Sequence, residues 1–293
     1  MGNSKSTLSK QNINLTNERG KQQKNDFKEP MKEIYKSEHE IDRMQRAHFT
    51  LQHLFRNNFS CPMEETLKMG GRVLDGGCGS GAWLLDMAMH YPNSHFFGVD
   101  IAEIYPSQIK LANVKFHQCD LMQLEQLGFE KNSFHMMQIK NMQLVLDVKD
   151  YAQIVEKMLK LLKPGGYFEL SEVEIIFSDY GPNFTRIIKM LEMGLKRSTD
   201  LNLEKIFFAT EQVINIQRET RVIKLGPSGN IVGELYLTNL EEFFTGDIKE
   251  VLMGLMDMTP KEYENFWQQC KAECIELETR ITFARVWGQK AVI

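Results

Sequence analysis

The residues best suited to chemistry form one short run, in which a carboxylate stands directly before a glycine-rich turn. Asp75 is followed by Gly76, Gly77, Cys78, Gly79, Ser80 and Gly81. Glycines allow a sharp turn and let the backbone approach a ligand closely. The N–H groups at the start of the helix expected next are free to point at that ligand. A carboxylate in this place would repel a pyrophosphate but can accept hydrogen bonds from an ammonium group. The run therefore predicts a site for a nucleotide-like ligand that carries positive charge.

Two further carboxylates come at the ends of the next expected strands, at residues 95–100 and 114–119. Asp100 ends the first strand and Asp120 follows the second. Because the carboxyl ends of parallel strands meet at one edge of a sheet, both acids are expected beside the glycine turn. Asp100 can accept hydrogen bonds from both hydroxyls of a ribose. Asp120 can accept one from an adenine amino group, while Leu121 packs on the ring.

Two cofactors fit parts of this pattern. The spacing from Gly77 to Ala82 also satisfies the looser dinucleotide fingerprint, which would make the chain a nicotinamide-dependent oxidoreductase. S-adenosylmethionine (SAM) instead carries an ammonium and a sulfonium and no phosphate. Asp75 favours SAM over NAD, and so does Asp120, because dinucleotide folds do not require that third acid.

The elements that must position these residues alternate between strand and helix. The expected core consists of strands at 73–74, 95–100, 114–119, 133–139 and 167–173, with helices at 82–90 and 150–162. Lys140 and Asn141 follow the fourth strand, at the edge where open α/β sheets place ligands. The segment Leu-Lys-Pro-Gly-Gly at 162–166 is expected to stop the preceding helix and form a tight turn before the fifth strand.

Helices are expected on both sides of this core. They cover 33–59 and 63–68 before it and 184–198, most of 234–258 and 259–278 after it, with late strands at 219–225 and 280–287. Thr259-Pro-Lys-Glu is a capping box that starts the last helix. Arg43 and His48, on the first helix, can face the cofactor site from this position, but they are interpreted as surface or interface residues. The fold class expected is α/β: a Rossmann-like, mostly parallel sheet with an antiparallel last strand and helices on both faces, under a helical N-terminal lid and a C-terminal cap.

The expected domain organisation is a disordered tail followed by one domain. Residues 1–30 are rich in Lys, Asn, Gln and Ser without a useful apolar period. The domain covers 31–293, with N-terminal helices at 31–69, the cofactor-binding core at 70–175, and the cap helices and last strands at 176–293.

Composition narrows the class of protein. The chain has 293 residues and a net charge of −4, which argues against direct binding to nucleic acid. No apolar run approaches the roughly 18 residues of a membrane span. The five cysteines are scattered, which indicates a reducing compartment. Cys270 and Cys274 are four apart on an expected helix, but no third and fourth ligand is clustered with them, so no metal site is expected.

The N-terminus carries a possible acylation signal. Met1-Gly2 with Ser6 fits the N-myristoylation pattern, and the lysines of the tail could add weak attraction to anionic lipid. A single acyl chain anchors only marginally. The polar N-terminus has no secretory signal. We therefore expect a cytoplasmic protein, with nuclear or weakly membrane-associated localisation as alternatives.

Two motifs resemble those of the class I SAM-dependent methyltransferases: the run at 72–81 and Leu-Lys-Pro-Gly-Gly at 162–166. Over about 70–175 the sequence looks like the fungal LaeA-like methyltransferases, a group that includes regulators of secondary metabolism. The resemblance and the positions together place the cofactor on Asp75, Gly76, Gly77, Cys78, Gly79, Gly81, Asp100, Ile101, Asp120, Leu121 and Lys140. The chain departs from the pattern at His135, where an acid is usual, and at Gly76, where a branched residue is commoner and a looser turn is expected.

No catalytic constellation is present in the sequence, which is compatible with methyl transfer. The sulfonium is already a good leaving group, so alignment of the reactants can supply much of the rate enhancement. A base is needed only if the acceptor is protonated when bound, and Glu169, Glu172 and Lys140 are candidates by position. The first functional hypothesis is methyl transfer to an unidentified small molecule or protein. The alternative is a SAM-binding regulator with little or no activity that works through protein partners.

Overall fold

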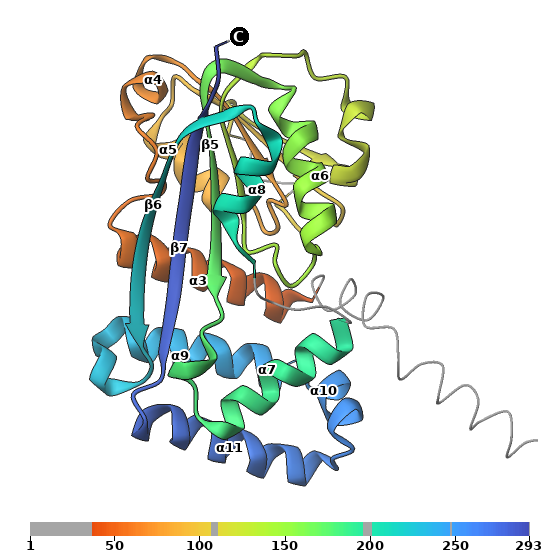
Figure 1. The fold of residues 1–293 in the computed structure, drawn as a ribbon, viewed down its shortest axis with the longest axis vertical. Helices are drawn as coiled ribbons and strands as arrows, with labels where there is room; N and C mark the ends of the chain where they lie inside the picture. The colour runs from red at the N-terminus through yellow and green to blue at the C-terminus, as the bar shows by residue number, and fades with distance from the viewer. Residues whose placement is uncertain (1–36, 107–110, 196–200, 247, 293) are drawn as a thin grey trace, which may run out of the picture.

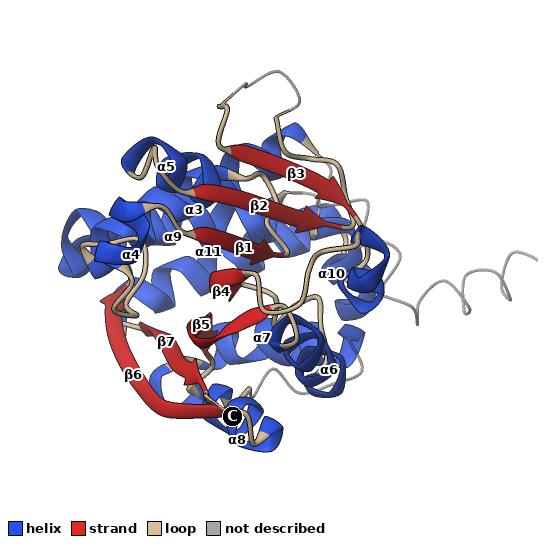
Figure 2. Ribbon diagram, turned by 90° about the horizontal axis from the view of Figure 1, so that it is seen from above, coloured by secondary structure: helices blue, strands red, loops and turns tan. Residues whose placement is uncertain are grey.

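The computed structural model describes residues 37–106, 111–195, 201–246 and 248–292, and these contain a seven-stranded sheet. The strands are β1 (Arg72–Gly76), β2 (His95–Asp100), β3 (Val114–Gln118), β4 (Phe134–Lys140), β5 (Leu162–Glu174), β6 (Val213–Lys224) and β7 (Arg280–Lys290). Their order is β3-β2-β1-β4-β5-β7-β6, and β7 runs antiparallel to both of its neighbours (Figure 2). The predicted fold class, including the antiparallel last strand, is confirmed.

Nine α-helices and three short 3₁₀ helices are found in the described part of the chain. They are α3 (Glu38–Phe55), α4 (Glu64–Met69), α5 (Ala82–His90), η1 (Leu121–Leu127), α6 (Val148–Leu159), η2 (Phe177–Asp179), α7 (Pro182–Leu195), α8 (Leu203–Thr210), η3 (Pro227–Gly229), α9 (Asn230–Thr245), α10 (Lys249–Met256) and α11 (Pro260–Glu276). The capping box at Thr259 forms as predicted. Helix α8 and the first half of β6 are not anticipated by the sequence pattern. The tail at 1–30, with its acylation motif, and the ends of two expected helices at 33–36 and 196–198 lie outside the described residues.

The segment Leu-Lys-Pro-Gly-Gly is not the tight turn that the sequence predicts. Helix α6 ends at Leu159, and β5 already begins at Leu162, which pairs with Phe134. The register then shifts before Met136 pairs with Tyr167. A bulge of this kind accommodates a proline, which cannot donate to the ladder, and a glycine at φ 78°. The motif therefore kinks the strand instead of preceding it.

The helices form two groups relative to the sheet. In Figure 1 the strand β5 points toward α3, and α7, α9, α10 and α11 lie beyond α3 at the same end of the molecule. These helices share an apolar core with Phe184, Phe244 and Trp267 at its centre. Helix α6 covers one face of the sheet through Ile154, Val155 and other buried residues. The lid and cap positions expected from the sequence are thus occupied by α3 and by the C-terminal helices.

None of the helices in the described residues is both long enough and apolar enough to cross a membrane.

Candidate functional site

The glycine-rich turn joins β1 to α5 and is held against the end of β2. The backbone N–H groups of Gly77 and Cys78 donate to the Val99 carbonyl, at 2.8 and 3.2 Å. Gly77 has φ 75°, and a Cβ there would lie 2.5 Å from the sulfur of Met142. A larger residue is therefore excluded by the backbone conformation and by the close approach of the loop after β4. The predicted turn forms as the sequence indicates.

Gly76 does not loosen the turn. It is the last residue of β1, and an ideal Cβ built on it would lie 3.0 Å from the sulfur of Met158. The buried Met158 side chain, on α6, fills the space that a branched residue would take. The expectation of a looser turn is wrong, because the missing side-chain volume is supplied from the neighbouring helix.

Asp75 and Lys140 are brought together at the carboxyl ends of β1 and β4. Asp75 is buried and Lys140 is half-buried, and each responds to the charge of the other. Burial raises the pKa of Asp75 to about 7, against the attraction of the Lys140 ammonium. Burial likewise lowers the pKa of Lys140 to about 8, against the attraction of Asp75. Within the described residues no hydrogen bond holds the Lys140 ammonium. Charged groups that are poorly solvated and poorly paired are typical of functional sites.

Asp100 and Asp120 lie at the ends of their strands as predicted, and each already accepts backbone hydrogen bonds. Asp100 accepts from the N–H of Gly79 at 2.8 Å and from that of Ala102 at 2.9 Å. Burial raises the Asp100 pKa despite these bonds. Asp120 caps η1 through the N–H of Met122 at 2.8 Å. Of their neighbours, Leu121 is buried and Ile101 is half exposed.

The other two candidate bases are committed to backbone anchoring. Glu169 accepts from the N–H groups of Ser60 and Cys61, at 2.7 and 2.9 Å, and so ties the α3–α4 connection to the sheet. Glu172 accepts from the N–H of Met142 at 2.7 Å and from the hydroxyl of Tyr151 at 3.0 Å. Burial raises the pKa of Glu172 to about 7. Glu169 Oε1 has no hydrogen-bond partner among the described residues and lies 3.8 Å from Arg285 Nε, and the Lys140 ammonium likewise makes no hydrogen bond there.

The sequence analysis missed a buried polar cluster that joins α3 to α5. Asp86 is 4% exposed and faces α3. One of its oxygens lies 3.2 Å from His48 Nε2 and accepts from Gln52 at 2.6 Å and Asn58 at 2.8 Å. Burial lowers the pKa of His48 to about 3, so the ring is neutral near pH 7. Of the two predicted alternatives, His48 therefore takes the interface position and not the surface one. In the sequence, the sign of this cluster is Asp86 itself, a charged residue on the largely apolar helix α5.

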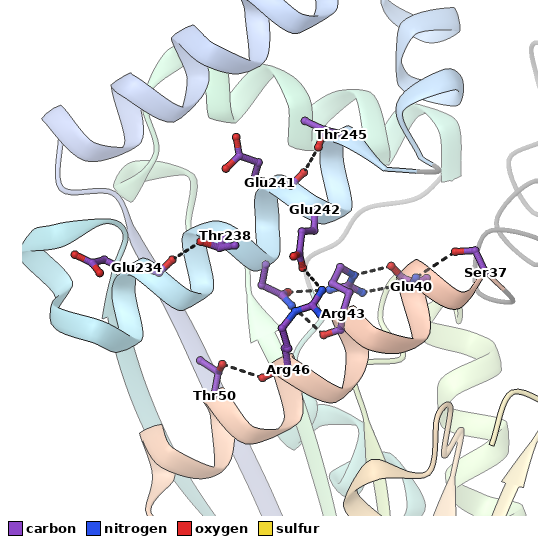
Figure 3. Close-up of polar contacts among 11 residues, drawn as sticks. Ser37, Glu40, Arg43, Arg46, Thr50, Glu234, Thr238, Glu241, Glu242 and Thr245 are labelled. Carbon is purple, nitrogen blue, oxygen red and sulfur yellow. Dashed lines mark hydrogen bonds and ion pairs between the residues drawn. The ribbon is translucent and has the colours of Figure 1, made fainter. Parts of the chain in front are cut away.

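Arg43 does lie at an interface, as predicted. Its guanidinium pairs with Glu40 on the same helix and donates to Asn239 on α9 at 2.8 Å (Figure 3). Asn239 returns a hydrogen bond to the Arg43 carbonyl at 3.0 Å. One turn further on, Arg46 pairs with Glu242 at 2.6 Å. These contacts fix α3 between the cap and the glycine turn, where the Met44 sulfur lies 3.4 Å from an ideal Cβ on Gly79.

The contacts of His135 are structural and lie away from the cofactor site. It lies near the amino end of β4, where its Nδ1 accepts from the N–H of Arg72 at 2.9 Å. Its Nε2 lies 2.8 Å from the Lys163 ammonium. Burial lowers the pKa of His135. The departure from the usual acid therefore serves the connection between β1, β4 and the bulged start of β5.

No group of three or more metal-ligating side chains occurs in the described residues. Cys270 and Cys274 are both buried in the cap core, on α11. Their position agrees with packing on one face of a helix.

Comparison with known proteins gives three results. A family model described as a methyltransferase domain matches residues 67–196. The secondary metabolism regulator laeA of Coprinopsis cinerea is 27% identical over 158 residues, which is 52% of this chain and 38% of that protein. The laeA protein of Aspergillus fumisynnematus is 26% identical over 224 residues, which is 74% of this chain and 53% of that protein. The chain thus spans about half the length, or less, of these relatives.

A solved structure agrees at the level of the fold. Phosphoethanolamine N-methyltransferase 2 of Haemonchus contortus, in complex with S-adenosyl-L-methionine, superposes with a TM-score of 0.53 at 19% identity. The match covers 91% of this chain and 60% of that one. The chain therefore has the fold of the class I SAM-dependent methyltransferases, and residues 67–196 are similar to the methyltransferase-domain model. In sequence it is similar to the fungal LaeA regulators, as predicted.

Proposed function

We propose that the protein binds SAM at the glycine turn and transfers its methyl group to an acceptor held between α3 and the carboxyl ends of β4 and β5. The observation that carries this proposal is the buried carboxylate of Asp75 beside the turn, with a pKa raised to about 7 by burial. A buried acid gains most from a cationic partner, and the ammonium of SAM would supply one. A nicotinamide dinucleotide would bring phosphates to the same place.

Each predicted residue has a distinct part in this proposal. Asp75 accepts from the amino-acid end of SAM, and Asp100 accepts from the ribose hydroxyls at the end of β2. Gly79 leaves room for the ligand against the backbone, and Gly77 gives the turn its positive φ. The Asp120 oxygen that does not cap η1 accepts a hydrogen bond from the adenine amino group. Leu121 packs against the face of the adenine ring, and Ile101 packs against its edge. The structure supports these assignments by gathering the three acids at one edge of the sheet.

The methyl transfer step requires few catalytic groups from the protein. A lone pair of the acceptor attacks the methyl carbon, the bond from that carbon to sulfur breaks, and its electron pair stays on sulfur as a neutral thioether. Alignment of the two reactants supplies much of the acceleration. Lys140 lies at the mouth of the site with its pKa lowered to about 8, so it can orient an acceptor or take up its proton near neutral pH.

The direct test is transfer of label. The protein is incubated with methyl-labelled SAM and, separately, with a small-molecule extract and a protein extract of fungal cells. We expect label in one pool, and at least about fivefold less of it with Asp100→Ala at SAM concentrations near the wild-type Kd, because a tenfold weaker affinity lowers the occupancy of the site to about one tenth. Label in neither pool, from a protein that binds SAM, would favour the regulatory alternative.

SAM affinity should depend on pH through Asp75. The carboxylate must be ionised to receive the ammonium, and its pKa is about 7. The affinity should therefore fall about tenfold between pH 7.5 and pH 6, because each unit below the pKa removes nine tenths of the ionised form. Calorimetric titrations across this range measure it, and Asp75→Asn should show a flat profile. An affinity that rises on acidification would contradict the assigned role.

Lys140→Met should separate binding from transfer. Methionine keeps the apolar stem of this half-buried side chain and removes the ammonium. We expect SAM affinity within about threefold of wild type, and a fall in the transfer rate at saturating SAM to the acceptor found by labelling. Equal rates for the two proteins would remove Lys140 from the reaction.

The second candidate function is regulation through protein partners, and similarity to the laeA regulators favours it. In this reading SAM binding stabilises the position of α3, and a partner recognises the resulting surface. A transfer-deficient variant with intact SAM binding, such as Lys140→Met, distinguishes the two. It would keep biological function under the regulatory hypothesis and lose it under the enzymatic one.

A further inference from the structure

The sheet carries a groove of about 520 Å³ away from the glycine turn. The groove is lined by Arg72, His95, Phe97, Lys115, His117 and Phe129. Arg72 and His95 are the first residues of β1 and β2 and stand in register with each other. The groove therefore lies toward the amino ends of these strands, whereas the cofactor site is at their carboxyl ends. Its volume falls within the usual range for small-molecule sites.

The groove is open because the connection from β3 to β4 contains little helix. Residues 119–133, all of them described, form only the short 3₁₀ helix η1, and η1 packs against α6. The neighbouring strands β2 and β3 stand at one end of the sheet in Figure 2, and alternate residues of each point to this face. Phe97 and Lys115 are paired across the strands there.

The lining is basic and aromatic, with no acidic residue among the six. The guanidinium of Arg72 lies 5.0 Å from the ring centroids of both Phe97 and Phe134. Its Nε is buried and has no hydrogen-bond partner within the described residues, and the same is true of His117 Nε2. In a chain with a net charge of −4, this is a local concentration of unused donors and positive charge.

The rings have the arrangement that a planar ligand needs. Phe97 and His117 are nearly parallel, with an interplanar angle of 12°. Phe129 stands almost perpendicular to both, at 79° to Phe97 and 89° to His117. A flat aromatic group can rest against the parallel pair while its edge meets the Phe129 ring, as bases do on aromatic side chains in nucleotide-binding proteins.

We propose that this groove binds a free nucleoside monophosphate, with the base against the aromatic rings and the phosphate at Arg72 and Lys115. Arginine and lysine together supply a forked donor and a point charge for one phosphate group. The site is independent of the cofactor site and of the proposed methyl transfer.

Calorimetry on the full chain with adenosine monophosphate tests this, in the presence of saturating S-adenosylhomocysteine so that the cofactor site is filled. We expect the monophosphate to bind at least tenfold more tightly than adenosine or inorganic phosphate alone. Lys115→Glu, on the edge strand, should weaken it about tenfold, because the reversal removes an attractive charge and adds a repulsive one. Lys261→Glu, the same change at an exposed position of α11, should leave the affinity for adenosine monophosphate unaltered. Phe129→Leu keeps an apolar side chain but removes the ring. It should weaken the binding of adenosine monophosphate and leave the binding of phosphate unchanged.

Three results would overturn the proposal. The first is no binding of adenosine monophosphate to the wild type. The second is equal binding to the wild type and to Lys115→Glu. The third is a hexa-adenylate that binds far more tightly than the monophosphate, which would assign the groove to nucleic acid instead of a free nucleotide.

Discussion

Asp75→Asn is expected to make the unliganded protein more stable at pH 8 and to weaken SAM binding at least tenfold. The carboxylate is buried, and its folded pKa of about 7 lies above the ordinary value of 3.8. A raised acid pKa means that ionisation opposes folding above that pKa. This rise in the pKa of Asp75 corresponds to at most ~4 kcal/mol, part of which is offset by the lost attraction for Lys140. The binding loss follows from one charge-assisted hydrogen bond, at about 1.5–3 kcal/mol.

The size of the stability difference between Asp75→Asn and the wild type depends on pH. The difference between Asp75→Asn and wild type should be largest above pH 7 and vanish below about pH 4, where the acid is protonated in both the folded and the unfolded state. Thermal unfolding across this range measures it. Asp257→Asn, at an exposed position where asparagine is well tolerated, is the control and should change neither property. Destabilisation at pH 8 together with unchanged SAM affinity would show that Asp75 is structural.

Asp86→Ala should destabilise the protein by about 3 kcal/mol and release α3. The change leaves the buried His48 and the half-buried Gln52 and Asn58 without their shared acceptor, and the loss of a partner costs a fully buried polar group about 1–3 kcal/mol. Denaturant unfolding gives the stability. Hydrogen exchange of the folded variant reports on α3, whose amides should exchange faster than those of α6.

The conservative variant separates the hydrogen bonds from packing. Asp86→Asn keeps the size and one acceptor oxygen, so it should recover part of the loss. Asp42→Ala removes an exposed carboxylate from α3 and should be neutral. If the folded Asp86→Ala protein exchanges its α3 amides at the wild-type rate, the cluster does not hold the lid.

The parts of the fold that sequence reasoning predicts are those with local physical causes. The glycine turn follows from the backbone freedom of Gly77 and Gly81, both of which have positive φ. The strand-end acids Asp100 and Asp120 follow because parallel strands share an edge. The start of α11 follows from its capping box. In each case the deciding contact joins residues that are close in the chain or ordered by a strong periodicity.

The features that sequence reasoning missed depend on contacts between distant segments. The side-chain volume missing at Gly76 is filled by Met158, about eighty residues later in the chain. His48 is buried because Asp86 faces it from another helix. His135 bonds to the backbone of Arg72 across two strands. The sequence around each of these residues does not identify its partner. Their roles are therefore seen only in the tertiary structure, which brings the pairs together.

A calorimetric titration of the full chain with S-adenosylhomocysteine and with NAD at pH 7.5, repeated on Asp100→Ala, decides which cofactor the glycine turn binds. We expect one site for S-adenosylhomocysteine, at least tenfold weaker in the variant because the ribose hydroxyls lose their charged acceptor, and no heat from NAD. Tight NAD binding without a signal from S-adenosylhomocysteine would contradict this expectation. So would an unchanged affinity for S-adenosylhomocysteine in folded Asp100→Ala.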